Sequence, residues 1–221
     1  MPIVLFEDNH CIVVLKPFNM LTQGDITGDY SLFDWTKSYI KEKYKKPGNV
    51  YLGMIHRLDR PAAGVVLFAR TSKAAARLSE QFRTNTVKKK YCAVVENRVV
   101  FEDGKSLIHF LKKNRKTNVV TAYDKPVKDA KKSILHFETR QIIGKMTLLE
   151  INLETGRSHQ IRAQLAKIGH PILGDIKYGA TKPLKRKNIA LFSYFLAVEH
   201  PTKKERIEFC FEPEKEWWNI F

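Results

Sequence analysis

The sequence predicts an α+β fold in which helices flank a large mixed, mostly antiparallel sheet. Segments with a strand pattern outnumber helical segments, and the two kinds do not alternate regularly along the chain. That order argues against a doubly wound nucleotide-binding fold. With 221 residues, 43% of them hydrophobic, and no evident linker or repeat, the chain is expected to form a single domain over residues 1–221.

The N-terminal part predicts short strands and two helices. Ser31 followed by Asp34 has the spacing of a capping box, and Phe33, Tyr39 and Ile40 give the segment after Ser31 an apolar side. The expected elements are strands at 3–6 and 12–15 around a turn at 7–10, a helix at 31–44, a strand at 64–69 and an alanine-rich helix at 71–82.

The C-terminal part predicts mostly strands. Ile161, Leu165 and Ile168 recur with the helical period, and Gly169 marks the end of that helix. The expected elements are a strand at 89–96, three or four strands across 107–153 with a basic surface hairpin near 114–132, a helix at 158–168, strands at 189–198 and 206–211, and a short terminal helix at 214–221.

The chain is strongly basic. It carries 39 Lys and Arg against 23 Asp and Glu, a formal net charge of +16, and the clusters are dispersed over most of its length. Such a balance indicates a polyanionic partner, with nucleic acid first and an anionic membrane surface a weaker alternative.

The cysteine spacing and the lack of targeting or membrane-spanning segments predict the cellular compartment of the protein. Cys11, Cys92 and Cys210 are far apart and form no Cys-x-x-Cys pair, which fits a reducing environment. We find no signal peptide and no apolar run long enough to span a bilayer. A cytoplasmic protein without membrane attachment is therefore expected.

The segment from His56 to Gly64 places one carboxylate, Asp59, between Arg57 and Arg60. Pro61 fixes its own φ and Gly64 permits a bend, so Asp59 is expected on a loop between two extended segments. Flanking guanidinium groups favour the ionised carboxylate, which suits a nucleophile better than a general acid. Taken alone, this segment is better explained as an ion pair that fixes a turn, which is the more common arrangement.

A second unusual segment runs from Leu153 to Arg162, where a strand leads into a helix. The free N–H groups at a helix start, together with Arg157, His159 and Arg162, could bind a phosphate or a buried carboxylate. Alone, the segment reads as an ordinary strand-to-helix turn with exposed basic residues.

Metal and cofactor binding find little support in the sequence. His159 and His170 are separated by a predicted helix and have no cysteine nearby, and the zinc-deaminase motifs are missing. No Walker loop or Gly-x-Gly-x-x-Gly motif is present. We therefore expect no metal and no cofactor.

Taken together, these segments resemble the RluA-type family of RNA pseudouridine synthases. The resemblance extends from about residue 3 to the C-terminus, with the motifs in the family's order. They are Lys16-Pro17, His56-Arg57-Leu58-Asp59 with Gly64, Lys90-Tyr91-Cys92-Ala93-Val94-Val95, and Thr155 to Arg162 continuing through Gly169 to Gly179. Because the first motif begins almost at Met1, no N-terminal S4 domain is expected.

The resemblance implies isomerisation of a specific uridine in ribosomal or transfer RNA to pseudouridine, on a base flipped out of its stack. It implies that Asp59 is the nucleophile, that Arg162 forms a bidentate pair with it, and that Tyr91 stacks on the uracil. Whether Asp59 attacks the ribose or the base stays open. No cofactor is needed for an isomerisation.

The same resemblance implies a set of RNA-binding residues. Arg57 shares a side of its extended segment with Asp59 and would fill the gap left by the flipped base. The full set is Arg57, His56, Arg60, Arg157, His159, Gln160 and Lys16.

Ala62 and Ala63 depart from the family pattern, which has Thr-Ser there, so two hydroxyl groups that could brace the Asp59 loop are missing. That change favours an alternative, a non-catalytic basic RNA-binding protein. A third possibility is a small-molecule hydrolase that uses Asp59. With no recognisable dimerisation segment, we expect a monomer.

Overall fold

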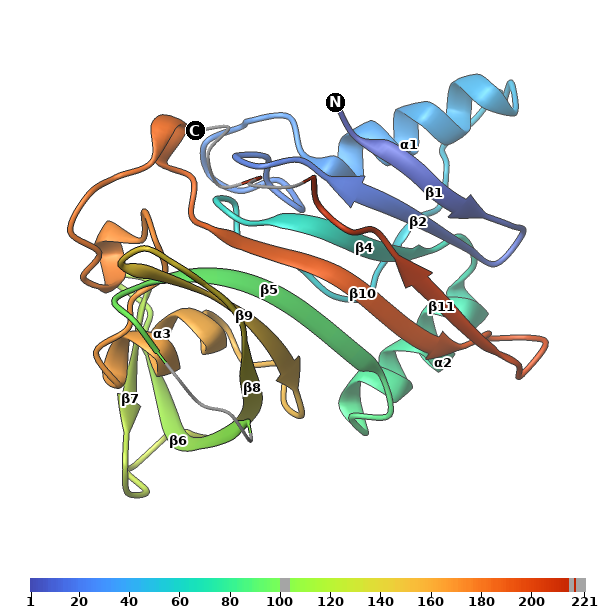
Figure 1. Cartoon of the computed structure of the whole chain (residues 1–221). Coiled ribbons are helices and arrows are strands. Elements are labelled where there is room, and N and C mark those ends of the chain that lie inside the picture. The colour runs from blue at the N-terminus through green and yellow to red at the C-terminus, as the bar shows by residue number, and fades with distance from the viewer. Residues whose placement is uncertain (100–103, 215–216, 218–221) are drawn as a thin grey trace. The chain divides into compact units, whose positions relative to one another are not determined.

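The computed structural model describes residues 1–99, 104–214 and 217. Eleven strands and three α-helices lie in these residues (Figure 1), which confirms the predicted α+β class. The backbone groups into two compact units. The first contains residues 1–87 and 193–212, and the second contains residues 88–192 and the segment from 213 onward. The predicted terminal helix at 214–221 lies largely outside the described residues, and the single-domain expectation stays a prediction.

The first unit is built on antiparallel strand pairs. β1 pairs with β2, β2 with β4, β3 with β4, and β10 with β11. β4 also neighbours β10, most of which belongs to this unit. The strands are β1 (Ile3–Glu7), β2 (Cys11–Lys16), β3 (Gly53–Met54), β4 (Ala63–Ala69), β10 (Leu191–Glu199) and β11 (Arg206–Cys210).

Two capped helices complete the first unit. α1 (Leu32–Lys43) begins after Ser31, which forms the predicted capping box with Asp34. α2 (Ser72–Arg83) begins after Thr71, whose hydroxyl accepts the Ala74 N–H. α1 begins where its capping box predicted, and α2 begins one residue after the predicted start at Thr71.

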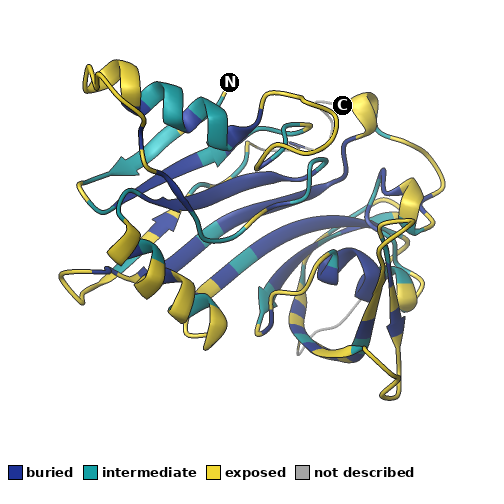
Figure 2. Ribbon diagram, turned by 180° about the vertical axis from the view of Figure 1, so that it is seen from behind, coloured by how far each residue is buried: buried dark blue, intermediate teal, exposed yellow. Residues whose placement is uncertain are grey.

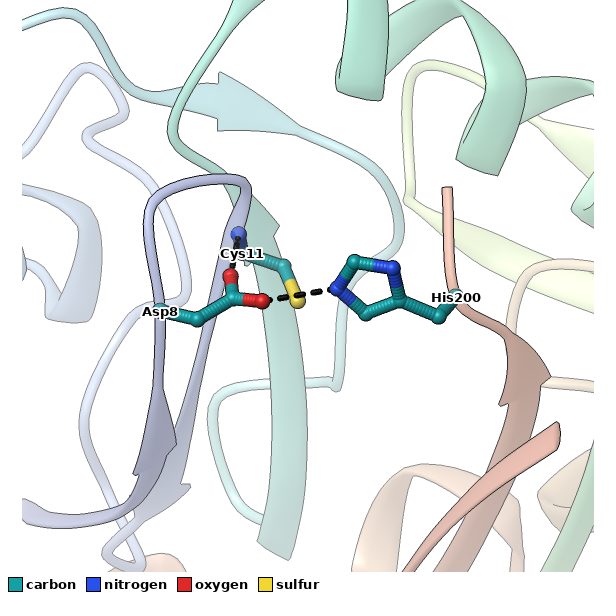
Figure 3. Close-up of side chains that lie close together, drawn as sticks. All are labelled: Asp8, Cys11 and His200. Carbon is teal, nitrogen blue, oxygen red and sulfur yellow. Dashed lines mark hydrogen bonds and ion pairs between the residues drawn. The ribbon is translucent and has the colours of Figure 1, made fainter. Parts of the chain in front are cut away.

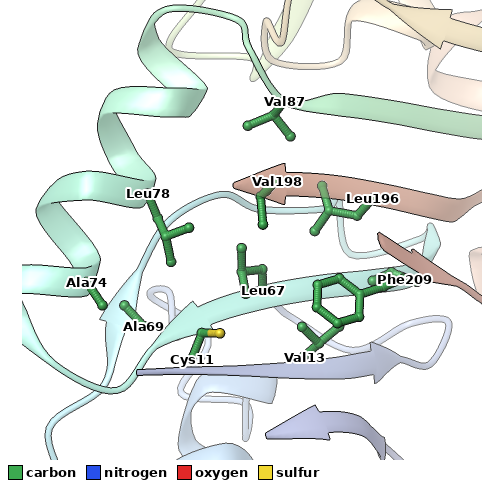
Figure 4. Packing of buried hydrophobic residues seen from close by; sticks show 11 residues of the cluster. Cys11, Val13, Leu67, Ala69, Ala74, Leu78, Val87, Leu196, Val198 and Phe209 are labelled. Carbon is green, nitrogen blue, oxygen red and sulfur yellow. The ribbon is translucent and has the colours of Figure 1, made fainter. Parts of the chain in front are cut away.

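The core of the first unit lies between α2 and its sheet. Leu78 points from α2 toward Leu67 of β4 and Leu196 of β10 (Figure 4), and all three side chains are buried. β4 is buried at all seven positions, which explains why its sequence is a continuous apolar run. This packing fixes the strand that follows the Asp59 loop.

The second unit is a five-stranded antiparallel sheet in the order β5-β9-β8-β6-β7. α3 (Gln160–Lys167) packs on β6 and β7 through Ala163, Leu111, Val120 and Ala122. The strands are β5 (Lys88–Glu96), β6 (Lys105–Asn114), β7 (Val119–Tyr123), β8 (Lys131–Ile143) and β9 (Met146–Leu153).

The structure corrects several predicted boundaries. α3 begins two residues later than expected because His159 adopts a left-handed conformation, with φ of 50°, that an α-helix cannot contain. The basic segment 114–132 forms two turns around the short strand β7, rather than one long hairpin. The two-residue strand β3 was missed because so short a segment has no readable alternation.

Within the part of the chain that the structure describes, no helix has the length and apolar character needed to cross a membrane.

Gly64, at the second position of β4, is required by the close approach of two backbones. Its φ is +128°, and a Cβ there would lie 2.2 Å from the carbonyl oxygen of Ser193 in β10. Any side chain would therefore push β4 and β10 apart as well as strain the backbone.

We expect Gly64→Ala to lower the free energy of unfolding by roughly 2–6 kcal/mol, since it combines backbone strain with overpacking. Urea denaturation followed by circular dichroism measures this loss. Gly28→Ala is the matched control, because Gly28 also has a positive φ of 72° but no atom within 4 Å of the added Cβ. A loss at Gly64 no larger than the roughly 1 kcal/mol expected of strain alone at Gly28 would contradict the assignment.

Candidate active-site loop and nucleic-acid-binding residues

Asp59 lies on the connection between β3 and β4, as its flanking residues predicted. The connection ends in a turn closed by a hydrogen bond from the Ala62 N–H to the Asp59 carbonyl, at 3.1 Å, with Arg60 and Pro61 between them. Asp59 itself is half-buried. A carboxylate on such a short, closed turn is held in one place while it keeps access to solvent.

Lys16 holds this loop from inside the protein. It is the last residue of β2, its exposed fraction is 0%, and its ammonium donates to the carbonyls of Pro17 (3.0 Å), Met20 (2.7 Å) and Arg60 (3.2 Å). Three N–H donors thus meet three carbonyl oxygens. Direct RNA contact, predicted for Lys16, does not fit this burial. The side chain positions the loop instead.

Lys16 also carries its charge close to Asp59. Burial lowers the pKa of Lys16 to about 7, the Asp59 carboxylate acts in the opposite direction, and the Arg60 guanidinium lowers that pKa further. The ammonium therefore both ties the turn and places a positive charge beside the candidate nucleophile.

Thr22 is a second brace of the Asp59 loop. Its buried hydroxyl donates to the Leu58 carbonyl (2.8 Å) and accepts the Leu58 N–H (3.1 Å), one residue before Asp59. Ala62 and Ala63 are themselves buried, at 2% and 1% exposed. Thr22, in the loop after β2, thus makes hydrogen bonds to this connection that hydroxyl groups at positions 62 and 63 could otherwise make. Sequence reasoning missed Thr22, because nothing in its neighbourhood marks it.

The two arginines beside Asp59 differ in their surroundings. Arg57 is exposed and faces solvent. Arg60 is half-buried, and its guanidinium donates to Asn19 Oδ1 (3.2 Å) and Asp29 Oδ2 (2.6 Å). Arg57 is therefore the better placed of the two to bind a phosphate.

Two contacts within the first unit fix the position of the His56 side chain. Its Nε2 accepts the Leu67 N–H at 3.0 Å, and its ring stacks on Phe82 with centroids 4.7 Å apart. The ring thus links the start of the Asp59 connection to β4 and α2.

In the second unit, Tyr91 lies on β5 and is 8% exposed. It pairs with Ile151 of β9, which pairs with Phe137 of β8, so the three side chains point to one face of the sheet. This is a flat, apolar setting of the kind that a stacking residue needs.

Arg162 is buried in α3 and forms a bidentate ion pair with Asp175. Its Nε donates to Oδ2 (2.7 Å), its Nη2 donates to Oδ1 (2.8 Å), and the guanidinium lies over the Tyr178 ring at 4.8 Å. Sequence reasoning did not identify Asp175 as a partner, although it stands in the same motif. The predicted pair with Asp59, which belongs to the other unit, stays a prediction.

The start of α3 brings together Arg157, His159 and Gln160. Arg157 is exposed, whereas Gln160 is buried, accepts the Arg157 N–H (3.0 Å) and donates to the Ile134 carbonyl (3.0 Å). Nδ1 of His159 lies 2.7 Å from the Tyr178 hydroxyl. Direct RNA contact from Gln160, predicted from the sequence, does not fit its position under the loop. The Gln160 side chain instead contacts the backbone of Arg157.

Among the described residues, one cluster has the composition of a metal site: Asp8, Cys11 and His200, whose potential ligand atoms lie within 4.8 Å of one another (Figure 3). His200 Nδ1 accepts the N–H groups of Thr202 (3.2 Å) and Lys203 (2.9 Å), so the ring's proton is on Nε2, which donates to Asp8 at 2.7 Å.

The protonated Nε2 faces the other members of the cluster and is therefore not a ligand. Burial raises the pKa of Cys11 to about 12, with Asp8 adding to the effect, so the sulfur is a thiol. The cluster fits a structural tie between the turn before β2 and the turn after β10 better than it fits a metal centre.

Comparison with known proteins places these elements in a family. The family model "RNA pseudouridylate synthase" matches residues 10–167. The chain is 33% identical over 211 residues to an uncharacterized RNA pseudouridine synthase of Bacillus subtilis, and 31% identical over 214 residues to the ribosomal large subunit pseudouridine synthase C of Buchnera aphidicola. These matches cover 93% and 92% of this chain but 67% and 64% of the relatives.

A shorter relative matches along nearly its full length. The tRNA pseudouridine synthase C of Haemophilus influenzae is 26% identical over 98% of this chain and 95% of its own. The structure of human RNA pseudouridylate synthase domain containing 4 superposes with a TM-score of 0.79 at 20% identity, over 97% of this chain and 90% of that one, and shows the same fold. The chain belongs to the RNA pseudouridylate synthase family.

Proposed function

We propose that this chain converts a uridine in RNA to pseudouridine, with Asp59 as the nucleophile. The observation that carries the proposal is the Asp59 turn, which is fixed by the buried ammonium of Lys16 and by both hydrogen bonds of Thr22. A free-standing turn would not need a buried cation whose desolvation is costly. Positioning a carboxylate for attack gives a reason for that cost.

Roles for the other catalytic residues rest on the family resemblance and fit their surroundings. Tyr91 would stack on the uracil from its place on β5. Arg162 would orient Asp59, and its bidentate pairing with Asp175 holds its guanidinium in a fixed plane.

RNA binding would involve the exposed and half-buried members of the predicted set. Arg57, His56, Arg60, Arg157 and His159 keep this role, with Arg57 filling the gap left by the flipped base. Lys16 and Gln160 act by positioning. The net charge of +16 would offset part of the cost of base flipping through phosphate contacts.

The substrate class proposed is ribosomal or transfer RNA, since relatives carry names of both kinds. We propose that the whole chain acts as one catalytic domain, as a monomer in the cytoplasm, and without a metal or cofactor.

The alternative, a non-catalytic RNA-binding protein, rests on Ala62 and Ala63. It is weakened by Thr22 and Lys16, which brace the Asp59 turn without the missing hydroxyls.

Asp59→Asn should reduce tritium release from RNA containing 5-tritiated uridine to background, because the amide is not nucleophilic. The control is Asp129→Asn, which makes the same change at an exposed residue with φ of 65°, where Asn is well tolerated. Wild-type release by Asp59→Asn would refute the nucleophile, and no release by the wild type from any cellular RNA pool would refute the enzyme.

Lys16→Met should lower kcat/KM by up to about 100-fold, with little change in RNA affinity, because the Arg60 carbonyl loses its donor and the turn is freed. Lys41→Met, on the exposed side of α1, is the matched control. An unchanged kcat/KM in Lys16→Met would remove Lys16 from the site.

The wild type and Lys16→Met should differ in how kcat/KM depends on pH. The pKa of Lys16 is about 7, so its ammonium is lost as the pH rises through that value. We expect a component of wild-type kcat/KM to decline as the pH rises above about 7, and this component to be missing from Lys16→Met. Tritium release at pH 6 to 9 measures both profiles, and identical profiles would contradict the role of the charge.

A further inference from the structure

One face of the second unit's sheet exposes apolar side chains. Along β6, Leu107 and Leu111 are each 5% exposed and point to the face that α3 covers, while Ile108 is 51% exposed and Lys112 is exposed on the opposite face. Figure 2 shows this alternation of buried and exposed residues along the strands. We call the uncovered side the outer face.

The strand register brings aromatic rings together on the outer face. Phe110 of β6 pairs directly with Tyr123 of β7 on one side and with Lys132 of β8 on the other. Directly paired residues have Cβ atoms about 5 Å apart, so Tyr123, Phe110 and Lys132 form a row across three strands. Lys112 lies two residues from Phe110 on the same face.

The surroundings of this row are strongly basic. Between Gly104 and Phe137 there are nine Lys or Arg residues, at positions 105, 112, 113, 115, 116, 125, 128, 131 and 132, against two Asp, at 124 and 129. Asp124 is paired with Lys167 at 2.9 Å. Glu154 is the nearer acid on this face, since its carboxylate lies 3.3 Å from Nε2 of His136, four residues from Lys132 along β8; Glu138 is six residues from Lys132, or about 20 Å.

We propose that the outer face binds single-stranded RNA, with Phe110 and Tyr123 as stacking positions for two bases and Lys112 and Lys132 as phosphate contacts. The proposal deepens the function proposed above and depends on it for the identity of the partner. Unstacked bases need accessible rings beside cations, and this row supplies the exposed ring of Tyr123 and the half-buried ring of Phe110, whereas paired bases in a duplex cannot reach them. A protein partner without an acidic surface would leave the excess positive charge uncompensated.

The outer face is on the opposite side of the sheet from Tyr91. Tyr91 shares its face with Ile151 and Phe137, and Phe137 shares that face with the α3-covered Leu107 through Leu135. RNA on the outer face therefore lies on the opposite side of the sheet from the residue proposed to stack on the target base. β7 is the edge strand of this sheet, and its Val120 N–H donates to the Tyr178 hydroxyl at 2.9 Å. The outer face should affect RNA affinity and leave the chemical step unchanged.

The test is a double variant, Phe110→Leu with Tyr123→Leu, which keeps apolar side chains but removes both rings. We expect its affinity for a fluorescein-labelled 12-nucleotide oligouridylate, measured by anisotropy, to fall roughly 5- to 30-fold. Phe110→Tyr with Tyr123→Phe keeps both rings and should restore binding. Lys112→Gln and Lys132→Gln should each reduce the log–log salt slope by about 0.7, and Lys41→Gln is their control.

Tritium release separates this inference from the proposed function. The double variant should raise KM for cellular RNA and keep the wild-type kcat. Unchanged oligouridylate affinity in the folded double variant, or in the conservative single variant Tyr123→Leu, would overturn the outer face as an RNA site. Loss of binding in the variant together with no tritium release by the wild type would refute the enzyme and leave the RNA site standing.

Discussion

The buried ammonium of Lys16 is the interaction on which the Asp59 turn depends. A lysine with no exposed surface loses its hydration, and the fall of its pKa to about 7 reflects that loss. Carbonyls from three places in the chain replace the water, and one of them, Arg60, belongs to the turn itself. The loop after β2 and the connection before β4 are thereby fixed to one cation, so the Asp59 turn is held by a side chain 44 positions from Arg60 in the sequence.

In the second unit, buried polar side chains likewise fix the positions of neighbouring residues. Asp175 fixes the plane of the Arg162 guanidinium, and Gln160 fixes the backbone of Arg157. The motif residues thus fall into two groups, those whose side chains are exposed to solvent and those that hold their neighbours. Burial separates the groups, since Gln160 and Lys16 are covered whereas Arg57 and Arg157 are exposed.

Much of the fold was predictable because its signals are local. Ser31 with Asp34 marked the start of α1, and Pro61 with Gly64 marked the Asp59 turn. The partners of Lys16 were not predictable, because Met20 and Arg60 meet it only in the folded chain and lysine is normally exposed. The outer face was not predictable from the sequence for a different reason. The run from Leu107 to Leu111 is almost wholly apolar, so it shows no alternation from which to assign its faces.

The tie between Asp8 and His200 joins residues 192 positions apart within the first unit. That unit takes β1, β2 and β4 from the start of the chain and β11 from near its end, while the second unit is drawn mainly from one continuous stretch. During translation, the second unit can therefore assemble while the first still lacks two strands. The first unit is complete only after β10 and β11 have left the ribosome, so its sheet closes late in synthesis.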